Sequence, residues 1–373
     1  MRVLFIARYR DATMHRKVQW MAHEPDVTLR SLYPRRWQDE LVQVEQTRGE
    51  EPGLERRVLP MFGSPADPHR AVYRTLTFGM TEFRPHIVHA EEEPDSLAAL
   101  QIALCRCLFA PRARLLLHTW QNIDRPLARP VQWVLGYTLA AADAVLCANR
   151  AAVALLRRRG YSRPTPLIPA IGVDTHRFQP APSRPESGPF VAGYVGRLVQ
   201  EKGIDTLIDA VARLSGENLP RALHLRIIGG GPRADALRRR VGAAGLDAQT
   251  TFVPPAPPAQ IAGQMAKLDA LVLPSRTTTV WKEQLGRVLL EAMDVGVPVI
   301  GSDSGAIPEV IGDAGLIFPE GDAAALAERL RSLVLDPALR AKLVRQGIQR
   351  AGQEYSQRVL AARTVNFYRQ ICA

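Results

Sequence analysis

Short runs of Val, Ile, Leu and Phe alternate along the chain with longer stretches whose apolar residues recur every three or four positions. The short runs are typical of buried strands, and the longer stretches of amphipathic helices. In the first half the pattern predicts strands at Val3–Ala7, Val27–Leu32, His86–Ala90, Arg114–Thr119, Ala144–Ala148 and Pro166–Ile168. It predicts helices at His69–Phe83, Ser96–Phe109, Leu127–Ala142 and Arg150–Arg159. This alternation indicates an α/β fold with parallel sheets and crossover helices.

The alternation stops once and then restarts. Residues 179–189 read Q-P-A-P-S-R-P-E-S-G-P, and so many Pro and Ser residues cannot form a regular element. Beyond them the pattern predicts strands at Phe190–Val195, Leu223–Ile228, Thr251–Val253, Ala270–Leu273 and Val297–Ser302, and a last helix at Ser356–Ile371. We therefore expect a first domain at residues 1–178, a linker at 179–189, a second domain at 190–355 and a C-terminal helix within 356–373.

The bulk composition fits a globular chain with two domains. At 373 residues, with 46% hydrophobic and 23% charged residues, each domain can bury its own core. No apolar run approaches the roughly 18 residues of a membrane helix. The start, M-R-V-L-F-I-A-R, does not read as a signal peptide. The four cysteines lack metal-ligand spacing, and Cys105 and Cys107 are expected to be buried thiols. These features predict a cytoplasmic protein.

The net charge is +11, and it leans towards the first half. Residues 1–170 carry 24 Lys and Arg against 17 Asp and Glu, an excess of seven. No recognition motif accompanies this charge, so we do not expect nucleic-acid binding. Attraction to an anionic membrane surface, such as the inner membrane face, or to a phosphorylated acceptor fits better. The alternative is a general preference for arginine without a function.

The most informative stretch is W-K-E-Q-L-G-R-V-L-L-E-A-M-D-V-G, from Trp281 to Gly296. Two acids, Glu283 and Glu291, bracket seven residues. The run Val288–Met293 is predicted to be helical, which places Glu283 in a turn and Glu291 two turns inside the helix. A carboxylate on an apolar helix is costly to bury without a partner, so a solvent-facing acid is the alternative to a functional one.

This pattern resembles the E-x7-E signature of the family-four retaining glycosyltransferases, which have the GT-B fold. Other segments follow in that family's order: G-Y-V-G-R-L-V-Q-E-K-G, L-H-L-R-I-I-G-G-G-P, T-F-V-P, D-A-L-V-L-P-S, P-V-I-G-S-D-S-G-A-I-P-E-V-I and G-L-I-F-P-E-G-D. The resemblance covers roughly residues 189–335, whereas the first half matches only in outline. It implies two doubly wound, Rossmann-like domains facing a central cleft, with helix 356–373 packed back on the first domain.

The resemblance also implies roles for the residues around the two acids. Glu291 resembles the acid that binds the ribose hydroxyls of the nucleotide, and Glu283 the acid that binds the hydroxyls of the donor sugar. The backbone amides of Gln284, Leu285, Gly286 and Arg287 would cradle sugar and phosphate. The sequence E-Q-L-G departs from the usual E-G-F-G at Gln284, which leaves the geometry of the donor sugar open.

A phosphate site is expected nearby. Gly229-Gly230-Gly231-Pro232 follows a strand and precedes a helix, where glycines let the backbone approach a ligand and Pro preorganises the first helical turn. A tight turn is the alternative. With Arg197 and Lys202, the stretch predicts a pocket for a diphosphate. The resemblance adds Gly196 to this pocket and assigns recognition of the base to the backbone near Phe252 and Val253.

The first half offers fewer candidates. His118 ends a predicted strand in L-L-L-H-T-W and resembles a histidine placed beside the transferred sugar; a structural hydrogen bond is the alternative. Glu91, Glu92 and Glu93 follow another strand, where they either bind acceptor hydroxyls or are solvated. The family's glycine-rich first loop is absent, so acceptor or phosphate would contact Arg8, Arg10, Arg16 or Lys17, or nothing there.

Together these features predict a retaining glycosyltransferase. It would move a sugar from a nucleoside diphosphate sugar to a carbohydrate, lipid-linked or small-molecule acceptor, in polysaccharide, glycolipid or natural-product glycoside synthesis. The resemblance implies neither metal nor cofactor, because Arg197, Lys202 and helix amides would stabilise the departing diphosphate. The alternatives are a sugar-nucleotide epimerase or a phosphorylase-like enzyme on the same fold, or a protein that binds a nucleotide sugar without catalysis.

Overall fold

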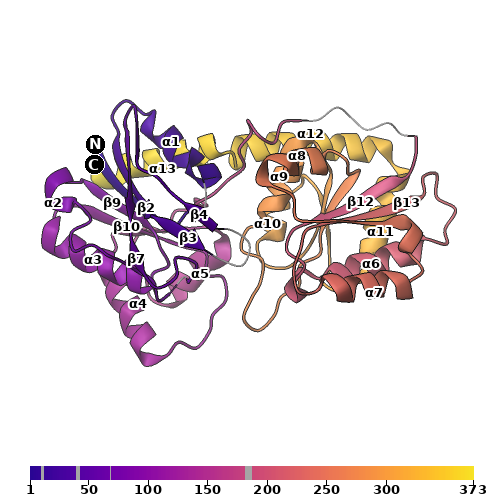
Figure 1. Cartoon of the computed structure of the whole chain (residues 1–373), viewed down its shortest axis with the longest axis horizontal. Helices are drawn as coiled ribbons and strands as arrows, with labels where there is room; N and C mark the ends of the chain where they lie inside the picture. The colour runs from indigo at the N-terminus through magenta and orange to yellow at the C-terminus, as the bar shows by residue number, and fades with distance from the viewer. Residues whose placement is uncertain (10–11, 39–42, 68, 181–186) are drawn as a thin grey trace. The chain divides into compact units, whose positions relative to one another are not determined.

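The computed structural model describes the chain except for residues 10–11, 39–42, 68 and 181–186, so most of the predicted linker lies outside the described residues (Figure 1). The chain divides into two compact units. Unit 1 comprises Met1–Gly172 and Gln357–Ala373, and unit 2 comprises Val173–Ser356. The division therefore falls after Gly172, whereas the sequence places the first domain's end at residue 178.

Unit 1 is built on a seven-stranded sheet in the order β11-β10-β9-β1-β2-β6-β5, in which all pairs but β5–β6 are parallel. Its strands are β1 (Arg2–Ala7), β2 (Thr28–Pro34), β5 (Gly49–Glu51), β6 (Leu54–Leu59), β9 (Ile87–Glu91), β10 (Arg114–Thr119) and β11 (Ala144–Cys147). Two small hairpins pair β3 (Arg36–Gln38) with β4 (Gln43–Glu45), and β7 (Met61–Phe62) with β8 (Val72–Tyr73).

Helices cover both faces of this sheet. The short helices are η1 (Ala12–His15), α1 (Arg16–Ala22) and α2 (Met80–Phe83). The longer ones are α3 (Leu97–Phe109), α4 (Arg129–Ala141), α5 (Arg150–Arg158) and α13 (Gln357–Cys372). One core joins the strands to α3, α4 and α5, and a second core joins them to α1 and α13. The C-terminal helix α13, yellow in Figure 1, therefore lies beside α1 and belongs to unit 1.

Unit 2 has a six-stranded parallel sheet in the order β14-β13-β12-β15-β16-β17. The strands are β12 (Phe190–Val195), β13 (Leu223–Ile228), β14 (Thr250–Val253), β15 (Ala270–Leu273), β16 (Val299–Ser302) and β17 (Leu316–Phe318). The helices are η2 (Gln200–Lys202), α6 (Ile204–Leu214), α7 (Ala234–Ala243), η3 (Asp247–Gln249), α8 (Pro258–Met265), α9 (Arg287–Val295), α10 (Ile307–Ile311), α11 (Ala323–Leu335) and α12 (Pro337–Glu354). Every residue of β12 is buried, as expected for a central parallel strand with both faces covered.

Two predicted elements are wrong. Residues 69–83 do not form one helix, because β8 pairs with β7 and only Met80–Phe83 are helical. The Gln101 side chain accepts from the Tyr73 N–H and donates to the carbonyls of Tyr73 and Thr75, so the backbone is hydrogen-bonded outside a helix. Residues 166–168 form no strand; Leu167 makes a single bridge to Cys147.

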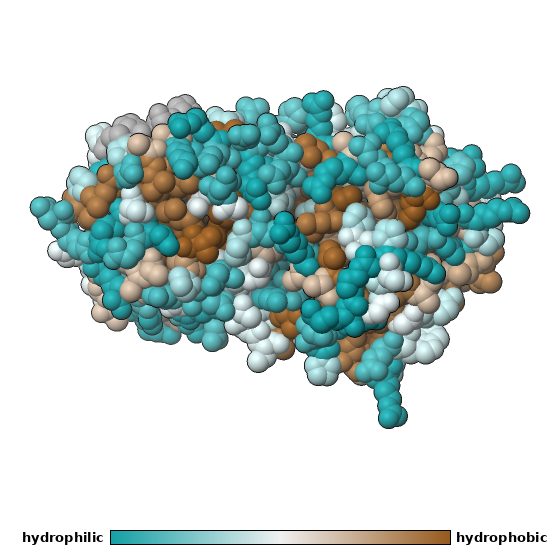
Figure 2. Space-filling model, turned by 180° about the vertical axis from the view of Figure 1, so that it is seen from behind, coloured by the Kyte–Doolittle hydropathy of each residue, from teal (hydrophilic) through white to brown (hydrophobic). Residues whose placement is uncertain are grey.

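The surface bears on two further predictions. Cys105 is buried as expected, but Cys107 is exposed, so its predicted burial is wrong. The face in Figure 2 is mostly hydrophilic, with hydrophobic patches between the charged side chains. Among the described residues, no helix combines the length and the apolar character needed to cross a membrane.

Candidate functional site

In unit 2 the site candidates gather where the strand order reverses. The chain proceeds from β12 to β13 and β14 on one side, and from β15 to β16 and β17 on the other. Ligands of doubly wound sheets bind outside the carboxyl ends of the strands at such a switch point. Lys202 follows β12 through η2, and Ser275 and Glu283 follow β15. The fold thereby brings together residues that lie 81 positions apart in the sequence.

Lys202 and Glu283 form an ion pair at this point. The distance from Lys202 Nζ to Glu283 Oε2 is 2.6 Å, and Ser275 Oγ donates to the same oxygen at 3.0 Å. The ammonium also lies 4.8 Å from the centre of the Trp281 ring, a cation–π contact. The two side chains are 15% and 10% exposed, so the pair is largely desolvated and yet reachable from solvent.

The backbone of Glu283 is held by a glycine turn. Gly305 has φ of 59°, and a side chain there would collide with the Glu283 carbonyl oxygen. That oxygen accepts from the Ala306 N–H at 2.9 Å. The Glu283 carboxylate therefore projects from an irregular segment that is fixed at its main chain.

Helix α9 begins four residues later, and its N-cap residue makes no side-chain capping hydrogen bond. The N-cap is Gly286 at φ of 71°. Because glycine has no side chain, an anion can approach the first backbone N–H groups of the helix. No acid lies in the first turn; Arg287 is the first helical residue. A cation at the positive end of a helix dipole is unfavourable by itself, and here the ion pair between Arg287 and Glu291 offsets this effect.

Glu291 lies in the second turn of α9, one turn earlier than predicted. Its Oε1 accepts from Arg287 Nε at 3.0 Å, and its side chain is mostly buried. Burial raises the pKa of this carboxyl, while the charges of Arg287 and Arg177 act in the opposite direction. Gln284 forms a bend between the two acids, and Leu285 is buried beneath it.

Arg197 and the glycine turn occupy the neighbouring loops. The Arg197 side chain is exposed, while its carbonyl accepts from Tyr194 Oη at 2.7 Å. Side chains at Gly229 or Gly231 would collide with the backbone of residues 196–198, and the Leu198 N–H donates to the Gly230 carbonyl at 2.8 Å. Close packing of two loops therefore requires these glycines, which favours the tight-turn alternative.

Two smaller predictions concern the same loops. Pro232 does not lie in a first helical turn, because α7 begins at Ala234. The Val253 carbonyl accepts from the Gly229 N–H at 3.0 Å, and Arg238 stacks 4.4 Å from the Phe252 ring. The end of β14 therefore lies beside the turn at Gly229–Gly231, which packs against the backbone of Gly196.

Unit 1 has its own switch point between β1 and β9, and another ion pair bridges it. Arg8 Nη2 lies 2.6 Å from Glu92 Oε2, with side chains 10% and 0% exposed. Glu92 also accepts from Arg8 Nε and from Tyr73 Oη, and Arg8 donates to the carbonyl of Asp67. This pair ties β1, β9 and the loop before β8 together.

Glu91 is buried in a similar way. Lys17 Nζ donates to it at 3.2 Å, and Tyr9 Oη donates as well. Lys17 itself is fully buried. The solvated alternative for the triple acid is therefore wrong, because Glu91 and Glu92 have buried cationic partners. Of the other predicted contacts, Arg10 lies outside the described residues and Arg16 lies on α1 near Gln19.

Glu93 differs from its two neighbours. It accepts from Thr119 Oγ1 at 2.7 Å and from the Trp120 N–H at 2.8 Å, both neutral donors. Burial raises the pKa of its carboxyl to about 7, because these hydrogen bonds compensate only part of the lost hydration.

His118 is the fifth residue of β10 and is 1% exposed. Its Nε2 lies 3.3 Å from the Ile168 carbonyl, and burial lowers the pKa of the ring to about 3, with the charge of Lys17 contributing. A neutral imidazole donating to a backbone carbonyl favours the structural alternative of the two that the sequence left open.

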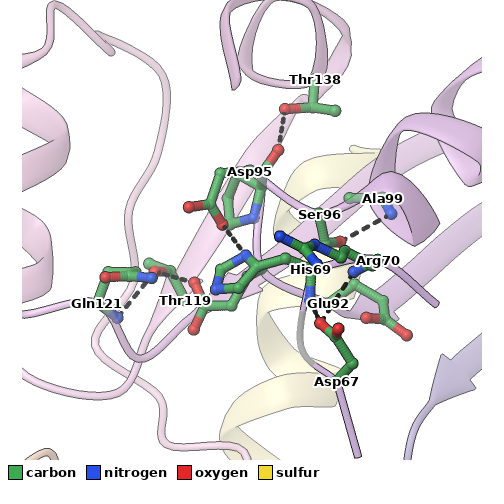
Figure 3. Close-up of polar contacts among 12 residues, drawn as sticks. Asp67, His69, Arg70, Glu92, Asp95, Ser96, Ala99, Thr119, Gln121 and Thr138 are labelled. Carbon is green, nitrogen blue, oxygen red and sulfur yellow. Dashed lines mark hydrogen bonds and ion pairs between the residues drawn. The ribbon is translucent and has the colours of Figure 1, made fainter. Parts of the chain in front are cut away.

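One cluster was missed by sequence analysis. His69, Asp95 and Arg125 meet at the carboxyl ends of β9 and β10, as Figure 3 shows for the first two. The sequence carried no signal for it, because the three residues come from separate loops and His69 was assigned to a helix. In the described part of the chain, no three His, Cys, Asp or Glu side chains gather closely enough to hold a metal ion.

Comparison with known proteins agrees with this arrangement. Residues 176–350 match the model of the family described as glycosyl transferases group 1. WcaL of Escherichia coli K12, named as a candidate colanic acid biosynthesis glycosyltransferase, is 30% identical over 209 residues, covering 55% of this chain and 51% of that protein. The glycogen synthase of Mycobacterium tuberculosis H37Rv is 32% identical over 203 residues, covering 53% and 46%. The chain thus spans about half the length of the curated relatives it matches.

The likeness to solved structures extends over the whole chain. Anabaena Alr3699/HepE in complex with UDP superposes with a TM-score of 0.73 at 18% identity, covering 99% of this chain and 100% of that one. The same protein has been solved in complex with UDP-glucose. At this identity the likeness establishes the fold, so the predicted GT-B architecture of two Rossmann-like domains is confirmed.

Proposed function

We propose that this chain belongs to the glycosyl transferases group 1 family, whose model matches residues 176–350, just under half of the chain, and that it transfers a sugar from a nucleoside diphosphate sugar to an acceptor. The observation that carries the proposal is the Lys202–Glu283 pair at the switch point of unit 2, four residues before the amino end of α9, whose N-cap is a glycine. A cation, a carboxylate and the amides of a helix amino end are groups that bind a sugar diphosphate.

The donor would lie across these groups in order. We propose that Glu291, in the second turn of α9, binds the ribose hydroxyls and that the backbone near Phe252 and Val253 binds the base. The diphosphate contacts Lys202, Arg197 and the amides of residues 284–287. Glu283 binds hydroxyls of the sugar, and a nucleotide like the UDP of the Anabaena protein is the first candidate to test.

The chemistry follows from where charge develops. As the bond between the anomeric carbon and the phosphate oxygen breaks, negative charge grows on the diphosphate, and Lys202 and the α9 amides stabilise it without rearranging. Glu283 accepts hydrogen bonds from the sugar, and these contacts position the ring as it flattens. We propose that the reaction retains the anomeric configuration and needs neither metal nor cofactor.

The acceptor is assigned to unit 1. A carbohydrate, a lipid-linked sugar or a small polyol fits the names of relatives that act in polysaccharide synthesis, and synthesis of a cell-envelope polysaccharide or a glycoside is the proposed role. The excess of arginine in the first half supports peripheral contact of a cytoplasmic enzyme with an anionic membrane surface.

Calorimetry on two variants tests the assignment of the donor site. Glu291→Ala is expected to weaken UDP and UDP-glucose alike, because both contain ribose. Glu283→Ala is expected to leave UDP bound almost normally while UDP-glucose binding or turnover falls. Binding and turnover should persist in excess EDTA. If the affinity for UDP falls equally in both variants, the roles assigned to the two acids are wrong. If the unaltered protein binds neither a nucleoside diphosphate nor a nucleoside diphosphate sugar, the proposed function is wrong.

A further inference from the structure

A polar cluster in unit 1 belongs to none of the contacts assigned above. His69 comes from the loop between β7 and β8, Asp95 from the turn between β9 and α3, and Arg125 from the loop between β10 and α4. All three lie at the carboxyl edge of the sheet, the edge at which doubly wound folds bind ligands. Figure 3 shows the His69 ring directed at the Asp95 carboxylate.

The main chain of His69 is held on both sides. Its N–H donates to Asp67 Oδ1 at 2.8 Å, and its carbonyl accepts from the Leu97 N–H at 2.9 Å. Arg8, bound to Glu92, donates to the Asp67 carbonyl and fixes the same loop. A surface histidine with this much support holds its ring in one place, which is a property of binding sites.

Asp95 is held as firmly. Its side chain is 5% exposed, and Ser96 caps α3 by accepting from the Ala99 N–H at 3.0 Å. Thr138 Oγ1 donates to the Pro94 carbonyl at 2.5 Å, so α4 fixes the preceding residue. Asp95 Oδ1 lies 3.3 Å from His69 Nδ1, and Oδ2 lies 3.6 Å from Arg125 Nη2.

The neighbours of the ring decide which nitrogen carries the proton. Arg125 Nη2 lies 3.3 Å from His69 Nε2, and a guanidinium can only donate. Nε2 therefore accepts, and Nδ1 carries the hydrogen that faces Asp95. The hydrogen bond to Asp95 raises the pKa of His69, while burial and the charge of Arg125 oppose it. The ring thus presents a basic nitrogen at a side chain that is 32% exposed.

The charges around the ring favour a neutral ligand over an anion. Arg125, itself 39% exposed, shares the single negative charge of Asp95, so the pair is neutral. Of the other acids near His69, Asp67 accepts from the backbone N–H groups of His69 and Arg70, and Glu93 has its pKa raised to about 7 by burial. No cation in this set lacks an acidic partner, and the lone pair of Nε2 is engaged by one hydrogen bond of 3.3 Å from Arg125. A hydroxyl group can replace this hydrogen bond, because its hydrogen can go to Nε2 and its oxygen can accept from Arg125.

We propose that His69, oriented by Asp95 and assisted by Arg125, binds a hydroxyl group of a neutral carbohydrate or polyol, and that this site is where unit 1 takes its acceptor. The acceptor role rests on the function proposed above, but binding of the hydroxyl does not. A purely structural role for the His69–Asp95 pair would leave the ring indifferent to added polyol.

The test is an NMR titration of the full chain with labelled histidine. Signals of His69 are assigned with His69→Gln, and the Nε2 shift is followed as myo-inositol or inorganic phosphate is added. The polyol is expected to move the Nε2 signal, and phosphate is expected to leave it in place. A response to phosphate alone would make this an anion site, and a response to neither probe would leave the pair structural; both results overturn the proposal.

Two variants sharpen the result. Asp95→Asn keeps the ring and its signals, so it works even if His69→Gln folds poorly. It is expected to lower the pKa of His69 and to weaken the polyol about threefold to tenfold, the range of one neutral hydrogen bond. His23→Gln, an exposed histidine of the same unit, is the matched control and should change nothing.

Nucleotide binding separates the two proposals. His69→Gln and Asp95→Asn should bind UDP within about twofold of the unaltered protein, because the nucleotide is assigned to unit 2. If the unaltered protein binds no nucleotide but its His69 responds to myo-inositol, the donor assignment fails and the hydroxyl site stands. If UDP binds normally and no polyol moves His69, the hydroxyl site fails alone.

Discussion

Each unit places an ion pair where its strand order reverses, and the two pairs are built for different purposes. In unit 1, Arg8 and Glu92 meet at 2.6 Å, with Glu92 fully buried and satisfied further by Tyr73. In unit 2, Lys202 and Glu283 meet at the same distance but keep some exposure beside Trp281. The same position in one architecture therefore serves as a structural tie in unit 1 and, we propose, as a ligand site in unit 2.

Removing the buried pair should give the largest effect. Arg8→Ala leaves Glu92 charged and without its cation in the core, which typically costs about 3–5 kcal/mol of unfolding free energy. Urea unfolding followed by tryptophan fluorescence measures the loss. Arg240→Ala, which breaks an exposed pair with Asp209, is the control and should cost at most about 1 kcal/mol. Equal losses in the two variants would contradict the contrast drawn between the pairs.

Glu93 sharpens the contrast, because it is a buried acid of unit 1 whose hydrogen-bond donors, Thr119 and Trp120, are neutral. Its pKa is about 7 in the folded chain against an ordinary 4.5, so the folded state resists its ionisation. The resulting loss of unfolding free energy is absent below pH 4.5, grows between pH 4.5 and 7, and stays constant at higher pH. Glu93→Gln should therefore stabilise the chain by about 3 kcal/mol above pH 7 and by almost nothing near pH 4.5.

Stability curves of Glu93→Gln from pH 4.5 to 9 measure this difference. Glu50→Gln, an exposed acid in the same unit, should show no such dependence. A constant offset between Glu93→Gln and the unaltered chain across the whole range would show that ionisation of Glu93 is not penalised.

Lys202→Ala should act on binding more than on stability. Loss of a charge-assisted contact to the diphosphate costs roughly 1.5–3 kcal/mol of binding free energy, which lowers the UDP affinity about tenfold to hundredfold. Calorimetry measures it, with the exposed Lys342→Ala as control. Normal UDP binding by Lys202→Ala, together with a large loss of stability, would make the pair of unit 2 a structural tie like that of unit 1.

The smallest effect is expected at His118. His118→Gln can keep a donor to the Ile168 carbonyl, so stability should fall by about 1 kcal/mol and turnover per folded molecule should stay within about twofold. Turnover is measured with UDP-glucose after correcting for the folded fraction. A large loss of turnover without a loss of stability would return His118 to the catalytic role that its sequence position suggested.

Much of the fold could be predicted because parallel strands are buried on both faces. Residues 114–119, 190–195 and 223–228 read as short apolar runs, and the structure places β10, β12 and β13 at those residues. Strands β3 to β8 were missed, because five of them have only two or three residues and β6, with six, is mostly half-buried and carries no such run. The helix predicted at residues 69–83 failed because Gln101, distant in sequence, captures the backbone at Tyr73.

The same division holds for the sites. The sequence alone determined that Glu283 precedes a helix and Glu291 lies within it, because both positions follow from local spacing. Only the tertiary structure decided that Lys202 reaches Glu283 and that His69, Asp95 and Arg125 meet. Tertiary burial also set the pKa of Glu93, since no local pattern reports how many water molecules a carboxylate loses. Contacts between distant segments depend on strand order and loop packing, which apolar periodicity does not encode.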